Sequence, residues 1–166
     1  MKRSNVMLST TLLVALTVGT VAVAVAVAQQ PASSHPPHLL ITPAELKWVA
    51  APPSLPPGAK AVLLEGDMAK PELFTLRLQL PANYRIPAHW HPAAEHVTVL
   101  SGAFHVGSGD TLDETKAKAL AAGSFMLMPA KTNHFAFTKT PTEIQLHGMG
   151  PWGITYVNPV DDPRKR

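Results

Sequence analysis

The chain has 166 residues, no cysteine, and 14 Lys and Arg against 11 Asp and Glu, which gives a formal net charge of +3 at pH 7. This length corresponds to one domain, and the absence of cysteine excludes disulfides, thiolate metal sites and a cysteine nucleophile. No basic run is interleaved with aromatic residues, so the sequence does not indicate nucleic-acid binding.

Residues 1–28 have the pattern of a signal peptide. Lys2 and Arg3 precede an apolar run over residues 7–28, which ends in Ala-Val-Ala before Gln29, the small residues that a signal peptidase accepts. We predict cleavage after residue 28, and hence a periplasmic or secreted protein with no stable membrane association. The alternative is an uncleaved anchor, since a run of this length can just span a bilayer. Cleavage would remove Lys2 and Arg3 and lower the net charge from +3 to +1.

The next segment, QQPASSHPPH at 29–38, is rich in Pro and Ser and lacks apolar periodicity, which predicts a flexible leader. The folded domain is expected over residues 39–160, with a charged tail at 161–166. Inside the domain, the Pro-rich stretch at 51–58 must be extended or turn-like, because proline fixes φ and lacks a backbone N–H.

From residue 72 onward the hydrophobic pattern has a period of two. In ELFTLRLQL (72–80) the apolar side chains from Phe74 to Leu80 alternate with polar ones, among which Arg77 is interpreted as an exposed strand residue. Six further short runs follow, most of them bounded by Gly or Pro: HVTVLSG, AFHVG, SFMLMP, HFAFT, TEIQLHG and GITYV. Many brief strands separated by turn residues predict an all-β barrel or sandwich.

One segment, DTLDETKAKAL at 110–120, predicts a short helix inserted between strands. Thr111 could cap its N-terminus, with Glu114 three residues later completing a capping box.

A cluster of ionisable residues, HWHPAAEH, occupies positions 89–96. His89 and His91 are separated by one residue, so both rings project to the same side of a strand. Glu95 follows after a turn, and His134 lies on a distant strand. Three imidazoles and one carboxylate are a suitable donor set for a divalent metal, and we predict that these four residues bind one ion. His96 has the opposite strand parity from Glu95, so it is expected to point away from the ligands.

At these positions the sequence resembles the cupins. The first cupin motif is Gly, five residues, His-x-His, three or four residues, Glu, six residues, Gly; it matches at His89, His91, Glu95 and Gly102, with Asn83 at the leading glycine. The second is Gly, five residues, Pro-x-Gly, two residues, His, three residues, Asn; it matches at Gly123, Pro129 and His134, with Lys131 and Thr138 at the inner Gly and the final Asn.

The resemblance implies a single cupin barrel, that is, a jelly roll or double-stranded β-helix, over the mature chain. Its departures from the motifs fall at turn and framing positions, so they bear on the local backbone rather than on the metal ligands. Cupins commonly pair through edge strands, and a homodimer is therefore expected; an exposed sheet edge gives such pairing a physical motive.

Four protein ligands leave one or two positions open on a five- or six-coordinate ion, as in a catalytic or ligand-binding site. Residue spacing does not choose between Fe, Mn, Cu, Ni, Co and Zn. Our first hypothesis is a metal-dependent oxidoreductase of dioxygenase type, or an isomerase, acting on a small organic molecule; the resemblance implies Glu95 as its catalytic base. The alternative is a non-catalytic protein that binds a metal and a small ligand, or a sensor.

Overall fold

The computed structural model describes residues 38–166; the predicted signal peptide and all but the last residue of the predicted leader lie outside the described residues. Short strands and single 3-10 turns make up the described part. The strands are β1 (Val49–Ala50), β2 (Lys60–Glu65), β3 (Leu73–Leu80), β4 (Arg85–Trp90), β5 (Glu95–Ser101), β6 (Ala103–Ser108), β7 (Lys118–Ala121), β8 (Phe125–Met128), β9 (His134–Thr138), β10 (Thr142–Met149) and β11 (Thr155–Tyr156). The 3-10 turns are η1 (Pro43–Glu45), η2 (Glu114–Lys116), η3 (Pro159–Asp161) and η4 (Pro163–Lys165).

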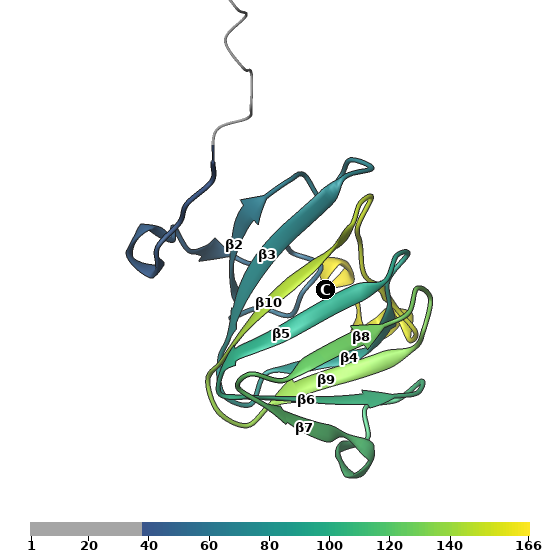
Figure 1. The fold of residues 1–166 in the computed structure, drawn as a ribbon. Coiled ribbons are helices and arrows are strands. Elements are labelled where there is room, and N and C mark those ends of the chain that lie inside the picture. Colours follow the sequence, from purple (N-terminus) through teal and green to yellow (C-terminus); the bar gives the residue numbers. More distant parts are fainter. Residues whose placement is uncertain (1–37) are drawn as a thin grey trace, which may run out of the picture. The chain divides into compact units, whose positions relative to one another are not determined.

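The strands form two sheets around a common hydrophobic core (Figure 1). One sheet has six strands in the order β1-β2-β3-β10-β5-β8, and the other has five in the order β11-β4-β9-β6-β7. Strands far apart in the sequence become neighbours, as when β10 pairs with both β3 and β5 in antiparallel register. This arrangement confirms the predicted all-β jelly roll.

Period-two alternation decides which side chains enter the core. On β3, Phe74, Leu76 and Leu78 are at most 6% exposed, whereas the alternate residues are only partly buried. Burying a side chain of this size contributes about 1.5–3 kcal/mol to stability. Arg77 lies on the outer side of the same strand, where its Nε donates to Gln145 Oε1 at 2.9 Å. The two sheets therefore present their apolar faces to each other.

The helical insertion expected over residues 110–120 is present only as the single 3-10 turn η2. Asp113, not Thr111, caps this turn, because its Oδ1 accepts a hydrogen bond from Thr115 N at 3.0 Å. The end of the segment is instead strand β7, paired with β6. Backbone hydrogen bonds to β6 and the packing of Leu120 against the core outweigh the local helix propensity here.

Two of the positions that depart from the cupin motifs adopt a left-handed backbone. Asn83 and Lys131 both have φ of 59°, where glycine is favoured because it lacks a Cβ. The turn geometry is thus retained without the glycines. The third position, Thr138, is buried, and its hydroxyl donates to Pro81 O at 2.6 Å and accepts from Tyr84 N at 3.1 Å. Thr138 thereby fixes the turn that contains Asn83.

Replacing Lys131 by glycine is expected to raise the free energy of unfolding by about 0.5–1 kcal/mol, because relief of left-handed strain exceeds the added entropy of the unfolded chain. Urea denaturation measures the change. Lys131→Ala is the control, since it removes the same exposed side chain but keeps the Cβ. An equal gain in both variants would assign the effect to the side chain and contradict the backbone explanation.

The C-terminal residues pack on the domain. The Asp162 carboxylate, which is 8% exposed, accepts hydrogen bonds from Arg164 Nε and Nη2, each at 2.7 Å. A second bond runs from Arg164 Nη2 to Ile154 O at 3.2 Å. The segment after η3 is thus tied to the loop that precedes β11.

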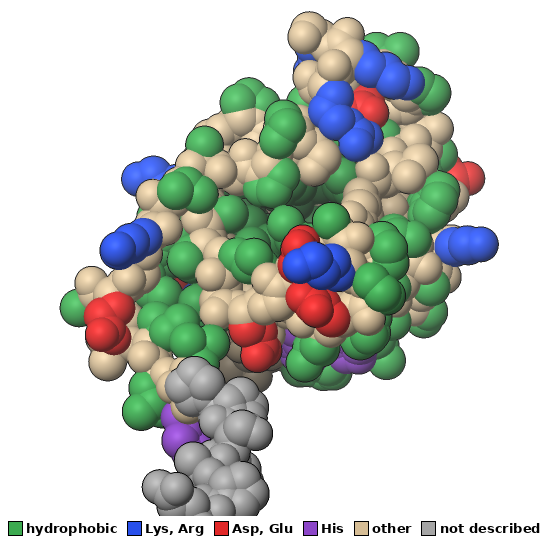
Figure 2. All heavy atoms as spheres, turned by 90° about the horizontal axis from the view of Figure 1, so that it is seen from above, with side chains coloured by type: hydrophobic (Ala, Val, Ile, Leu, Met, Phe, Trp, Pro, Cys, Tyr) green, Lys and Arg blue, Asp and Glu red, His purple; other side chains and the backbone are tan. Residues whose placement is uncertain are grey.

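Figure 2 shows one face of the molecule, where hydrophobic side chains surround a hollow and most Lys and Arg side chains lie nearer the margin. Within residues 38–166, no helix has the length and apolar character needed to cross a membrane.

Candidate metal centre

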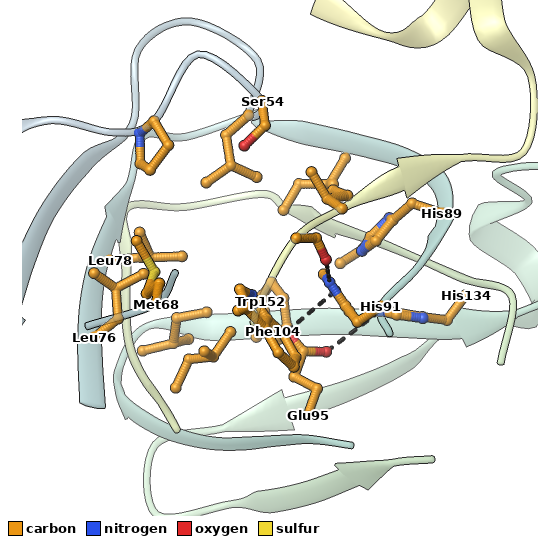
Figure 3. Close-up of a pocket in the computed structure, with 18 of the residues that line it drawn as sticks. Ser54, Met68, Leu76, Leu78, His89, His91, Glu95, Phe104, His134 and Trp152 are labelled. Carbon is orange, nitrogen blue, oxygen red and sulfur yellow. Dashed lines mark hydrogen bonds and ion pairs between the residues drawn. The ribbon is translucent and has the colours of Figure 1, made fainter. Parts of the chain in front are cut away.

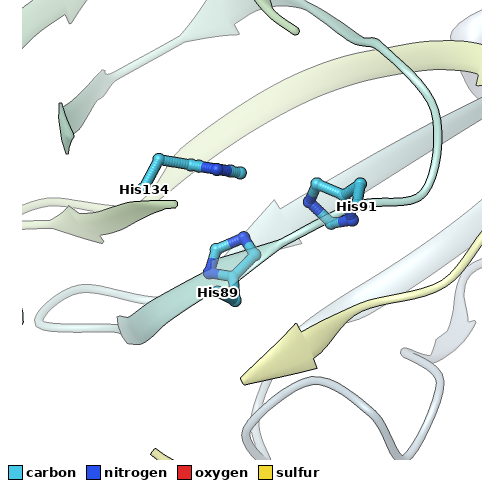
Figure 4. Close-up of side chains that lie close together, drawn as sticks. All are labelled: His89, His91 and His134. Carbon is cyan, nitrogen blue, oxygen red and sulfur yellow. The ribbon is translucent and has the colours of Figure 1, made fainter. Parts of the chain in front are cut away.

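Three imidazoles converge between the two sheets. His89 on β4 lies directly opposite His134 on β9 in the antiparallel register, and His91 follows the end of β4. All three are at most 6% exposed, and one ring nitrogen of each lies within 4.8 Å of the corresponding atoms of the other two. Their rings point toward a common space (Figure 4).

A β-bulge places His89 on this inner side. The register between β4 and β9 shifts between Ile86 and His89. Both side chains line the same cavity although they are three residues apart, whereas a regular strand would point them to opposite faces. Pro87 lies inside the shift, and proline is tolerated at bulges because it has no N–H to give to the ladder.

Backbone carbonyls fix the tautomer of each ring. Nδ1 of His89 lies 2.7 Å from Pro87 O, Nδ1 of His91 lies 2.7 Å from Gly153 O, and Nδ1 of His134 lies 2.9 Å from Thr132 O. A carbonyl only accepts, so each Nδ1 carries the proton and each Nε2 keeps its lone pair free.

This arrangement fits a cation. His91 Nε2 is buried without a hydrogen-bond partner among the described residues, and leaving a buried polar atom unpaired costs about 1–3 kcal/mol. Converging lone pairs are stabilised by a positive ion, and neutral imidazole is a common ligand of transition metals.

Glu95 adds a carboxylate from the opposite sheet. It is the first residue of β5 and is 7% exposed. Its Oε1 lies 3.6 Å from His91 Nε2, and its Oε2 lies 3.3 Å from His134 Nε2 (Figure 3). Metal–ligand bonds of about 2.0–2.2 Å place neighbouring donors about 3 Å apart. The structure thus places Glu95 beside His91 and His134, whereas the group in which one ligand atom of each residue lies within 4.8 Å of all the others consists of the three histidines.

The other histidines of the described β-strands lie outside this cluster. His96 stacks on His147 with ring centroids 4.9 Å apart and an interplanar angle of 8°. These two are cross-strand partners on β5 and β10, on the side of the sheet away from Glu95. His105 stacks on Phe137 at 4.6 Å.

Sequence reasoning missed two residues that hold His91 in place. The Trp152 indole stacks on the His91 ring, with centroids 4.4 Å apart and an interplanar angle of 15°, and it also packs against Phe74 at 5.3 Å. The next residue, Gly153, supplies the carbonyl for His91 Nδ1. A backbone acceptor has no residue-type signature, so only the aromatic character of Trp152 could have suggested its role.

The four donors face a cavity of about 170 Å³ whose remaining wall is almost entirely apolar. The Pro-rich loop at 51–58 contributes Ser54 to this wall. Two tyrosine hydroxyls anchor the loop: Tyr156 OH donates to Ser54 O at 2.8 Å, and Tyr84 OH donates to Pro56 O. Burial raises the pKa of both tyrosines, so both hydroxyls remain donors.

Burial also keeps imidazoles of the cluster neutral. It lowers the pKa of His89 well below 6.5, with a further contribution from the neighbouring His134, and it lowers the pKa of His91 despite the opposing effect of Glu95. Neutral imidazole is the form that binds a metal.

The metal-free protein should therefore lose stability as the pH falls below about 6.5. The folded-state pKa values of His89 and His91 lie below the unfolded value, so the unfolded chain binds more protons in this range and the free energy of unfolding decreases. Urea denaturation with a chelator present at pH 7.5 and 5.5 measures the slope. His89→Phe should reduce the change in the free energy of unfolding between these two pH values. An unchanged difference would contradict the assignment of this pH dependence to His89.

The chain matches the family described as the ChrR cupin-like domain over residues 36–152. No curated protein matches the chain.

Solved structures show the same fold. A candidate acetylacetone dioxygenase from Methylibium petroleiphilum PM1 is 19% identical with a TM-score of 0.59, covering 78% of this chain and 88% of that one. An RmlC-like cupin from Shewanella frigidimarina NCIMB 400 is 18% identical with a TM-score of 0.53, covering 68% and 91%. Salicylate 1,2-dioxygenase from Pseudaminobacter salicylatoxidans is 16% identical with a TM-score of 0.51, covering 63% and 32%.

At these identities the likeness concerns the fold alone. The family match extends over most of the chain and includes all four clustered donors. The chain therefore belongs to the cupin superfamily, in the family of ChrR cupin-like domains.

Proposed function

We propose that this protein is a metal-dependent oxidoreductase of dioxygenase type that acts on a small organic molecule. His89, His91, Glu95 and His134 would hold one divalent ion. The observation that carries the proposal is the convergence of three buried imidazole Nε2 atoms and one carboxylate at the wall of an otherwise apolar cavity.

When bound, a divalent ion would supply Lewis acidity to a substrate oxygen and an open coordination position beside it. The protein's own residues would exclude water and accept a proton. The apolar wall excludes water from the reacting atoms. Glu95, whose two oxygens each lie near one imidazole, is the one carboxylate among the described residues that line the cavity, and it would accept the substrate proton.

An isomerase would use the same residues but return the proton to a different substrate atom. Two structures that share the fold are described as dioxygenases, and another, from Ruegeria pomeroyi DSS-3, is described as a DMSP lyase. This fold thus hosts more than one chemistry, and the two dioxygenases make oxygenation our first choice.

A non-catalytic binding protein or sensor is the second candidate, and one observation favours it. Apart from Ser54 and the four donors, every described residue that lines the cavity is apolar. The cavity therefore has no second acid or base within its described wall, which a ligand-binding protein does not need.

Oxygen consumption separates the two candidates. The protein is loaded in turn with Fe, Mn, Cu, Ni, Co and Zn and mixed with catechols, flavonols and β-diketones. Oxygen uptake is expected with at least one redox-active metal and not with Zn. Glu95→Gln should retain some metal and lose uptake. A flat trace across the panel, together with reversible ligand binding, would leave the binding protein as the function.

The proposals of export and of a homodimer have separate support. Export rests on the sequence pattern of residues 1–28. The homodimer is supported by β8, an edge strand of the six-stranded sheet that contains no charged residue and exposes 58% of Phe125 and 53% of Leu127.

A further inference from the structure

The cavity wall opposite the imidazoles carries no group that could bind a charge. Met68, Leu76 and Leu78 lie on the far side of the cavity from His89 and His134 (Figure 3). Aliphatic, methionine and aromatic side chains from both sheets complete the wall. Apart from the four donors, Ser54 and the indole N–H of Trp152 are the polar side-chain groups among the described lining residues. This end of the cavity accepts hydrocarbon.

No Lys or Arg of the described chain lines the cavity. Arg77 lies on the same strand as Leu76 and Leu78 but projects from the other side of the sheet, where Nε donates to Gln145 Oε1 and Nη1 lies 3.9 Å from Glu143 Oε1. A carboxylate or phosphate at the apolar end of a ligand would therefore be buried without a counter-charge, which strongly disfavours binding. Sugar hydroxyls there would be left unpaired.

The donor end tolerates one negative charge. With a divalent ion bound by three neutral imidazoles and the Glu95 carboxylate, the site would have a net charge of +1. A ligand that loses one proton from an enol or phenol on binding neutralises this charge. A second anionic group cannot be balanced in the same way, since the rest of the wall is apolar.

The cavity is large enough for a small organic molecule. Its volume is about 170 Å³, and an apolar cavity of about 150 Å³ is known to hold benzene. A single ring with small substituents, or an open chain of similar size, fills it.

From these features we infer that the ligand is a small, uncharged organic molecule with oxygen donors at one end only and a hydrocarbon body. Diols and diketones of this type fit, whereas carboxylated aromatics, sugars and phosphate esters do not. The inference rests on the proposed function only in taking the four donors as the place where the ligand's oxygens bind.

Matched ligand pairs test this inference by calorimetric titration of the Zn-loaded protein, in which no redox reaction occurs. 4-Methylcatechol and 3,4-dihydroxybenzoate differ only by a methyl or a carboxylate group at the far end. Hexane-2,4-dione and 3,5-dioxohexanoate form the same contrast in an open chain. In at least one pair, the uncharged member should bind at least tenfold more tightly. Equal or tighter binding of the charged members, or no binding of either uncharged member, would overturn the inference.

A substitution at Met68 tests whether the apolar wall causes the preference for uncharged ligands. Met68→Lys places a cation on the apolar wall from a half-buried loop position and should shift the preference at least tenfold toward the carboxylated members. Met68→Leu is the control and should keep the preference of the parent protein. Metal content and circular dichroism verify that both variants fold. A preference unchanged in Met68→Lys would contradict the assignment of this wall.

Oxygen uptake, measured separately, keeps the two proposals distinct. Binding of the uncharged members without oxygen uptake would support the inferred ligand class and contradict the proposed dioxygenase function. Oxygen uptake with the carboxylated members would support the proposed dioxygenase function and contradict the inferred ligand class.

Discussion

Replacing His134 by alanine is expected to abolish stable binding of a divalent metal and to lower the melting temperature of the metal-treated protein. His134 is 2% exposed and is the one member of the cluster that β9 supplies. Its loss leaves the Glu95 carboxylate without the imidazole nitrogen now 3.3 Å away. Changes outside the ligand set already cost about 10–100-fold in metal affinity, so loss of a ligand should cost at least about 100-fold.

The loss in stability follows from mass action. At a metal concentration of about 1,000 times the Kd, binding stabilises the folded state by about 4 kcal/mol. His134→Ala and His91→Ala should each lose most of this stabilisation of the folded state by the metal. Elemental analysis gives the metal content, and thermal unfolding with and without chelator gives the linked stability.

His96→Ala is the matched control. The ring is adjacent to Glu95 in the sequence but lies on the outer side of β5, stacked on His147. Its removal should leave the metal content unchanged. If His96→Ala stripped the metal while His134→Ala retained it, the assignment of the site would be wrong.

Trp152→Ala should give the second large effect, with metal affinity lowered about 10–100-fold and stability lowered by about 3 kcal/mol. The indole stacks on His91 at 4.4 Å and packs on Phe74 at 5.3 Å, so its loss frees the ligand ring and opens the cavity wall. Competition with a chromophoric chelator measures affinity, and urea denaturation measures stability.

Trp152→Phe keeps an aromatic face and should retain most of both properties. Wild-type affinity in Trp152→Ala would show that the Gly153 carbonyl alone orients His91.

The fold was predictable wherever burial follows a simple period. The alternation over residues 72–80 correctly predicted which side chains of β3 enter the core, because one face of the sheet is buried. The helix predicted from the capping residues of segment 110–120 was wrong, because pairing between β6 and β7 determines the conformation at the end of that segment. Such pairing depends on residues distant in the sequence, and a local pattern does not contain it.

The side chains that cluster at the candidate site were predictable, and the backbone groups that orient them were not. Histidine and glutamate have distinctive chemistry, and their spacing in HWHPAAEH brought them to attention. The carbonyls of Pro87, Thr132 and Gly153, which set the ring tautomers, are backbone atoms that any residue could provide. Only the path of the chain shows which carbonyl reaches which ring.

The bulge on β4 makes this chemistry depend on how β4 pairs with β9 as well as on the identity of the residues. Regular pairing of the same residues, continuous with that of Ile86, would leave every donor in the chain yet turn His89, three residues further on, to the outer face of the sheet. A related protein could thus lose the site through the loss of the bulge alone, while a search for the four donor residues would still find them all.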